Sequence, residues 1–167
     1  MADYKKAEEQ AKEVWKQNFI LSVPFDLEEI ARNYGLEVVE VDFGEKFSNI
    51  AGYLKEKTIF VNGLDGENRK KFTIAHELGH FLLHQKELEE HPSQYAVLFR
   101  ITIGKMNNDP VEKEANCFAA NLLVPEEMLR EKLTQKIGIP QLAEIFGVSQ
   151  DVIGYRIQIL HSNHSNF

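Results

Sequence analysis

The segment FTIAHELGHFLLH, residues 72–84, constrains the fold of this chain more than any other. Its apolar residues recur at helical spacing, which predicts a helix that packs against the core. His76 and His80 are four residues apart, so their imidazoles lie one above the other on a helix and can reach the same metal ion. The spacing therefore predicts a metal site, and the competing interpretation is a buried helix with two core histidines.

Glu77 directly follows the first histidine and points about 100° around the helix from it. A zinc ion held by two histidines and a carboxylate lowers the pKa of a water molecule to about 7, and Glu77 can then pass its proton to a leaving amine. Gly79 lies between the two histidines, where a small residue permits close approach of another segment. This spacing is typical of a metal-dependent hydrolase.

The third ligand must come from another segment. A second helix is predicted to begin near Asp109 or Pro110, run through VEKEANCFAANLLV and stop before Pro125. Glu114 starts the apolar face of this helix, so its carboxylate can face the metal. Glu112 lies on a neighbouring face with Asn116 and competes for the same role. Acidic residues near a helix N-terminus also stay solvated and favour the helix dipole. Spacing alone leaves these interpretations open.

Other residues near the motif have both a functional and a structural interpretation. Tyr53, in a predicted strand, can stabilise a transition-state oxyanion or pack in the core. Asn116 can hydrogen-bond a ligand histidine or be a surface residue. His84 continues the spacing of the two histidines, but eight residues rotate a helix by about 80°, which aims it poorly as a ligand. Cys117, the only cysteine, is expected to be a buried, reduced thiol.

The region before the motif combines helices and strands. Helices are expected over residues 4–19 and 26–35, and a strand over residues 36–43. Two further strands, residues 50–54 and 58–62, are separated by polar residues and are expected to pair as a hairpin. Residues 86–110 are expected to be a largely irregular insertion.

Composition limits the class of protein. A chain of 167 residues with 43% hydrophobic types forms one compact domain, with room for a small appendage. A net charge of −7 argues against direct binding to nucleic acid or to an anionic membrane surface. No apolar run approaches the roughly 18 residues that a membrane span needs. We therefore expect a soluble, cytoplasmic protein without a membrane segment.

The motif and its downstream partner together resemble the ImmA/IrrE family of zinc metallo-endopeptidases. The resemblance rests on HELGH, preceded by FTIA and followed by FLLH, and on EANCFAANLLVP. It extends to AGYLKEKTIFVN, similar to the strands before the motif helix, and to LAEIFGVSQDVIGYRI, similar to a helix-turn-helix segment that often follows. The resemblance implies that zinc is bound by His76, His80 and Glu114, with Glu77 as the general base. It also implies that the protein cleaves a partner repressor containing a helix-turn-helix domain, encoded nearby.

The fold implied is α+β: a small zincin-like, minimal gluzincin domain, mainly helical, with an antiparallel-rich sheet of about three strands. Residues 1–130 would form this domain, residues 131–160 a helix-turn-helix-like segment packed on it, and residues 161–167 a frayed tail. Two alternatives stay open: a zinc-binding regulatory or toxin-antitoxin-type protein without proteolysis, and a helix-turn-helix DNA-binding regulator. The DNA-binding alternative lacks the positive charge needed to contact phosphates and bases, since its predicted recognition helix SQDVIGYRIQIL offers one arginine and one aspartate.

Overall fold

The computed structural model describes residues 1–90 and 109–162 of the chain. Most of the predicted insertion, residues 91–108, and the end of the predicted tail, residues 163–167, lie outside the described residues. The elements in chain order are α1 (Tyr4–Gln17), α2 (Leu27–Asn33), β1 (Glu37–Val41), a 3₁₀ turn (Glu45–Phe47), β2 (Gly52–Lys55), β3 (Thr58–Asn62), α3 (Glu67–Glu90), α5 (Pro110–Leu123), α6 (Glu126–Thr134), α7 (Ile139–Phe146) and α8 (Gln150–Ser162).

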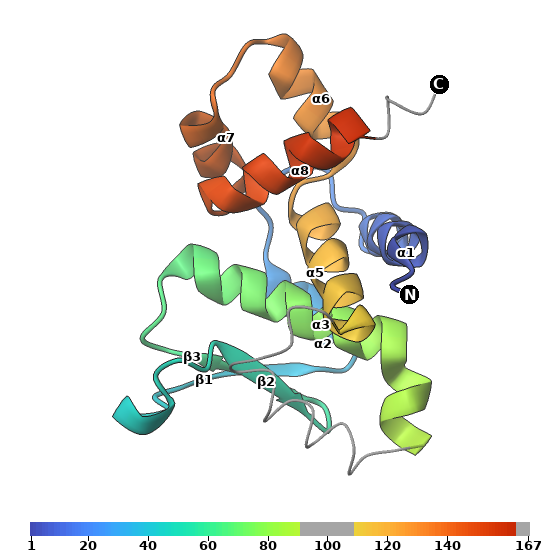
Figure 1. Cartoon of the computed structure of the whole chain (residues 1–167). Coiled ribbons are helices and arrows are strands. Elements are labelled where there is room, and N and C mark those ends of the chain that lie inside the picture. The colour runs from blue at the N-terminus through green and yellow to red at the C-terminus, as the bar shows by residue number, and fades with distance from the viewer. Residues whose placement is uncertain (91–108, 163–167) are drawn as a thin grey trace.

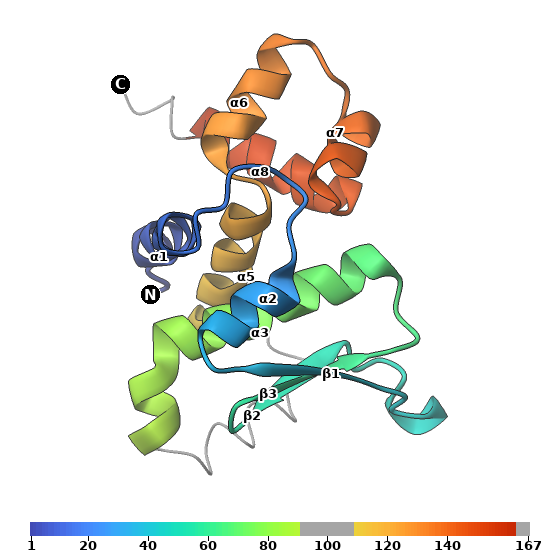
Figure 2. The same cartoon turned by 180° about the vertical axis from the view of Figure 1, so that it is seen from behind.

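Helix α3 forms the middle layer of the molecule (Figure 1). The small sheet lies on one side of it, and α5 crosses its other side with α1 alongside. Helix α2 packs behind α3 and leads into β1, as the view from behind shows (Figure 2). Helices α6, α7 and α8 gather at the far end of α5. The motif helix is therefore enclosed between the sheet and the helical layer, in agreement with the expected α+β class.

The sheet has the strand order β1-β3-β2. Strands β2 and β3 form the expected antiparallel hairpin, but β1 pairs with β3 in parallel. The sheet is therefore mixed, and the expectation of an antiparallel-rich sheet is wrong in this detail. The buried side chains of Leu54, Ile59 and Val61 lie beneath α3, so one face of the sheet forms part of the core.

Side chains and backbone conformations set the helix limits. Asp26 caps α2 by accepting from the backbone N–H groups of Glu28 and Glu29, and Asp109 caps α5 by accepting from Val111. Gly147 ends α7 with a φ of 64°, in the left-handed region that favours glycine. Among the described residues, no helix is both long and apolar enough to span a bilayer.

Helix α3 extends to Glu90, beyond the predicted start of the irregular segment at residue 86. It bends at His84, whose φ of −125° and ψ of 16° are not helical. The Lys6 ammonium group donates a hydrogen bond of 3.0 Å to the carbonyl of Leu83 beside the bend. A bend leaves backbone groups without their usual helical partners, so this contact stabilises the change of direction.

At Gly79, helix α3 packs tightly against α5. A Cβ atom at Gly79 would lie 2.8 Å from Cδ1 of Phe118, a side chain that is fully buried on α5. The Phe118 ring occupies the space that a side chain at position 79 would need, so a glycine is required there. This contact holds the two helices together directly beside His80.

We expect Gly79→Ala to lower the free energy of unfolding by up to about 2 kcal/mol, because overpacking against Phe118 outweighs the gain in helix propensity. Gly154→Ala on α8 is the matched control, since no heavy atom lies within 4 Å of its added Cβ. That control should raise stability by up to about 1 kcal/mol. Urea unfolding of both variants measures the difference, and equal effects at the two glycines would contradict the close contact.

Candidate metal centre

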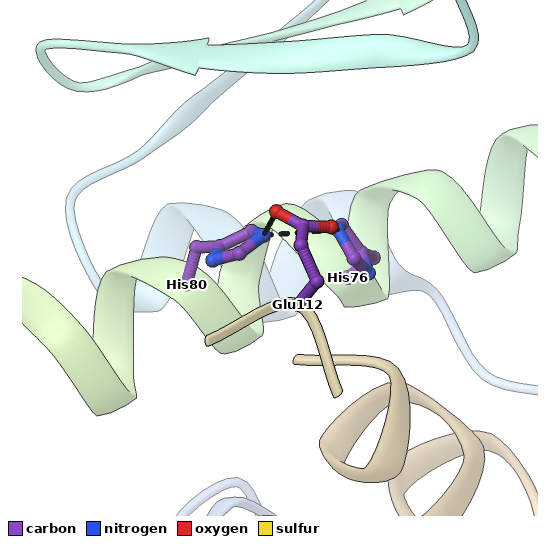
Figure 3. Close-up of side chains that lie close together, drawn as sticks. All are labelled: His76, His80 and Glu112. Atoms are coloured by element: carbon purple, nitrogen blue, oxygen red, sulfur yellow. Dashed lines mark hydrogen bonds and ion pairs between the residues drawn. The ribbon is translucent and has the colours of Figure 1, made fainter. Parts of the chain in front are cut away.

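Three donor groups converge on one point between α3 and α5 (Figure 3). Nε2 of His76 and Nε2 of His80 are 2.9 Å apart. The two oxygens of Glu112 lie 3.3 Å from His76 Nε2 and 3.1 Å from His80 Nε2. Both histidines come from consecutive turns of α3, and Glu112 comes from the first turn of α5. The predicted pair of histidines is therefore joined by a carboxylate.

The donor set fits a zinc ion. In a tetrahedral site with bonds of about 2.1 Å to nitrogen and oxygen, donor atoms are roughly 3.4 Å apart. The separations of 2.9, 3.1 and 3.3 Å are slightly shorter, so small side-chain shifts would seat an ion between them. Two imidazoles and a carboxylate leave a fourth position open, which is typical of catalytic zinc sites.

Glu114, the third ligand implied by the resemblance, does not lie with the two histidines. Its Oε1 accepts a hydrogen bond of 2.7 Å from the backbone N–H of Asp3, and its Oε2 is 3.4 Å from Nε2 of His84. The expected inward direction is correct, since Glu114 is buried. However, that face meets the N-terminal turn of α1 and the bend of α3. We therefore propose Glu112, the competitor, as the third ligand in place of Glu114.

Asn116 holds His76 from the side opposite the donor cluster. Its Oδ1 is 3.0 Å from Nδ1 of His76, and a carbonyl oxygen there requires Nδ1 to carry the proton. Nε2 of His76 is then the ring nitrogen that faces the other two donors and a metal ion between them. Of the two interpretations left open for Asn116, the hydrogen bond to a histidine is present, although the residue is also exposed; it lies one turn along α5 from Glu112.

The local electrostatics hold two of the three donors in the protonation state that a metal needs. Burial by itself would raise the pKa of Glu112, but hydrogen bonds from His76 and His80 lower it far below its usual range. Burial, together with the charge on His76, lowers the pKa of His80 to about 4. At neutral pH Glu112 is therefore a carboxylate and His80 a neutral imidazole, the forms that bind zinc. Burial by itself would lower the pKa of the third, His76, but its hydrogen bond to Glu112 raises that pKa, so metal binding there displaces a proton.

Glu77 lies apart from the donor cluster, as its position one residue after His76 predicts. Burial raises the pKa of Glu77 to about 7, although the charge on His76 and a backbone N–H of Leu54 act in the opposite direction. Its Oε2 is buried and accepts no hydrogen bond from the described residues. A carboxyl group with a pKa near neutrality suits proton transfer in both directions.

A cleft of about 270 Å³ opens over the donors, and Glu77 lines it together with His76, His80 and Glu112. The opposite wall consists of residues 49–52, which lead into β2. Helical spacing in the motif did not indicate this wall or the Leu54 contact, because both come from the sheet. In the sequence, only the predicted strand over residues 50–54 indicated that a sheet could lie near the motif helix.

Two of the remaining candidates lie elsewhere. Tyr53 does not line the metal cleft: its ring stacks on Phe60 at 4.9 Å and lies 5.8 Å from the ring of Phe43. Since side chains alternate along a strand, Tyr53 points away from the face that buries Leu54. His84 is buried beside Glu114, consistent with the expectation that it is not a third ligand.

Comparisons with known proteins agree with this geometry. The family model of the IrrE N-terminal-like domain, a peptidase family, matches residues 31–158, which include all three donors and Glu77. The chain belongs to the ImmA/IrrE family. Metallopeptidase ImmA of Bacillus subtilis (strain 168) is 32% identical over 95 residues, which are 56% of this chain and 52% of that protein. The chain thus aligns with about half of the length of this relative.

A solved structure of a Mycobacterium tuberculosis transcriptional regulator shares the fold of this ImmA/IrrE family member, with a TM-score of 0.65 and 20% sequence identity. The match covers 91% of this chain and 46% of the regulator. At this identity the similarity concerns the fold alone.

In this ImmA/IrrE family member, we expect Glu112→Gln to weaken zinc binding by about 100-fold or more, because a neutral amide replaces a charged ligand. Glu114→Gln is the matched control on the same helix. It should keep close to one zinc per chain and lower the unfolding temperature, since it weakens the contact with His84. Zinc content by mass spectrometry and competition with a chelating dye measure the first effect. Loss of zinc only in Glu114→Gln would reinstate the original assignment.

Cys117 should resist alkylation in the folded protein. Burial raises the pKa of its thiol from 9.0 to about 11, and its Sγ lies 3.4 Å from Nδ2 of Asn121. At pH 8 roughly one molecule in a thousand carries the reactive thiolate, and the fraction rises tenfold per pH unit below the pKa. Iodoacetamide labelling, followed by mass spectrometry, should be about 100-fold slower in the folded chain than in urea. Similar rates would contradict the burial of this thiol.

Proposed function

We propose that the protein is a zinc-dependent metallo-endopeptidase that hydrolyses a peptide bond in a partner protein. The observation that carries the proposal is the convergence of His76, His80 and Glu112 in one cleft with Glu77, a buried carboxylate outside the cluster. Membership of a peptidase family and similarity to a metallopeptidase support the same conclusion. A zinc ion held by the three donors would supply Lewis acidity toward a water molecule and the substrate carbonyl.

Glu77 performs the proton transfers in this proposal. With a pKa of about 7, about half of the Glu77 carboxyl groups are ionised at neutral pH and can accept a proton from the attacking water. It then donates that proton to the nitrogen of the leaving amine, so the carboxylate is regenerated in each cycle. The Leu54 backbone N–H fixes the direction of the carboxyl group, and burial keeps bulk water from competing for it.

Asn116 and Glu112, both on α5, contact the histidines, whereas Glu77 acts on the substrate. The Asn116 amide fixes the tautomer of His76. Glu112 is aimed by the N-terminal turn of α5, which Asp109 caps. An endopeptidase requires a cleft that an extended chain can enter, and we place the substrate in the cleft above these donors. The site thus combines rigid ligands with one proton-transferring group.

We further propose that the substrate is a transcriptional repressor with a helix-turn-helix domain, encoded next to this gene. The support is the resemblance of the paired motifs, HELGH and EANCFAANLLVP, to family members of that kind. The acidic surface charge fits a protein partner better than a nucleic acid. The alternative, a zinc-binding regulator without proteolysis, would use the same metal donors. A cleavage experiment distinguishes it from a peptidase.

That experiment incubates the zinc-loaded protein with the neighbouring repressor, with Glu77→Gln as the matched control. We expect the parent protein to cut the repressor at one or a few bonds. Glu77→Gln should retain close to one zinc per chain and lose at least about 100-fold in rate, because it removes only the proton acceptor. Gel electrophoresis, mass spectrometry of the products and zinc analysis provide the readouts.

Equal cleavage by the parent and Glu77→Gln would indicate a contaminating protease. A repressor that binds the zinc-loaded protein and is never cut would support the regulatory alternative. Specific, zinc-independent binding to an operator would instead favour the DNA-binding alternative.

A further inference from the structure

A second groove lies beside the metal cleft, between the first turns of α3 and α8. It has a volume of about 720 Å³, and its lining includes Asn68 and Phe72 on α3, Ser149 before α8, and Val152 on α8. Phe72 also lines the metal cleft, so the two hollows meet at one aromatic ring. Figures 1 and 2 both show the N-terminal ends of α3 and α8 next to each other.

One stripe of α3 connects this groove to the metal donors. Asn68, Phe72, His76 and His80 are each four residues apart, so they follow one side of the helix. Consecutive members are about 6 Å apart along the helix axis. A polypeptide that lies along this side of α3 with one bond at the donors therefore passes over Phe72 into the groove.

The position of the far wall is fixed by contacts between α3 and the turn before α8. Nδ2 of Asn68 donates a hydrogen bond of 3.2 Å to the carbonyl of Val148. Gly147 makes the tight turn that brings Val148 there, with a φ of 64°. The groove width is therefore set by a bonded junction within the fold.

The groove suits an apolar side chain. Its charged rim residues already have partners, since Arg69 Nε lies 3.1 Å from Asp65 and Glu67 lies 2.7 Å from Lys70. The half-buried side chains of Phe72 and Val152 remain as an apolar surface with the hydroxyl of Ser149 at its edge. Burying an apolar side chain on such a surface is favourable without new ion pairs.

We propose that this groove binds an apolar side chain of the extended substrate segment, about four residues from the scissile bond. The inference rests on the proposed peptidase function. The centre of the groove and the centre of the donor pair are about nine residues apart on α3, or roughly 14 Å, which an extended chain spans with about four residues. The C-terminal helices then serve in substrate selection, and Val152 is a specificity-determining residue.

The test uses peptides obtained by digesting a bacterial proteome. The zinc-loaded full chain is incubated with this mixture, new termini are identified by mass spectrometry, and Glu77→Gln defines the background. The parent protein should favour apolar residues about four positions to one side of the cut. Val152→Glu should reduce this enrichment by about tenfold and favour basic residues, whereas Val152→Lys should favour acidic ones. Opposite charge preferences cannot arise from partial unfolding.

Gln150→Glu is the matched control, because it adds the same charge to the same helix. Residues two apart on a helix point about 160–200° away from each other, and exposed Gln150 does not line the groove. Its cleavage profile should equal that of the parent protein. Sedimentation of each variant is measured in parallel.

The outcomes separate the two proposals. If the parent protein binds zinc and cuts no peptide and no repressor, the proposed function fails and this inference fails with it. If the parent protein cuts peptides and the Val152 variants keep its profile, only the groove assignment is overturned. If those variants instead change the sedimentation coefficient with an unaltered profile, the groove belongs to a second copy of the chain, which also overturns the inference.

Discussion

The contact between α3 and α5 is the constraint on which the site depends. His76 and His80 are placed by helix geometry alone, but Glu112 reaches them only because the two helices approach closely at Gly79. Phe118 fills the space that a side chain at Gly79 would occupy, so the separation of the helices is fixed by an aromatic ring beside His80. Side chains in close-packed interiors have little room to shift, so the packing of the core restricts the distances between the donor atoms.

The same packing determines which glutamate faces the histidines. Periodicity correctly predicted that Glu114 is buried, and it could not predict what covers it. The partners of Glu114 are the backbone N–H of Asp3, 111 residues away in sequence, and His84, the residue where α3 bends. Such partners are set by tertiary structure. Helical periodicity predicts which face of a helix is buried. It does not predict how the helix is rotated against its neighbour, and therefore not which residue each buried side chain contacts.

Other parts of the fold could be predicted because their causes are local. The hairpin β2–β3, the caps at Asp26 and Asp109, and the stop at Gly147 each follow from residues within one turn or one pair of strands. The parallel pairing of β1 with β3 could not, since it joins segments across the hairpin. Residues 91–108 lie outside the described residues, so the predicted irregular insertion is tested only at its two ends: residues 86–90 are helical, and Asp109 and Pro110 cap and start α5.

The single arginine of the predicted recognition helix argues against DNA binding and also fixes the position of the C-terminal helices. Arg156 is the only arginine of the predicted recognition helix, and it is 2% exposed. Its Nε donates a hydrogen bond of 3.0 Å to the carbonyl of Val124, just beyond the end of α5. The cation that a DNA-binding interpretation needs on the surface is therefore used to fasten α8 to the end of α5, the helix that carries Glu112. Because α5 carries a metal donor at one end and this junction at the other, the start of α8 keeps a fixed position relative to the donors. A fixed position is what a substrate preference at a defined distance from the cut bond requires.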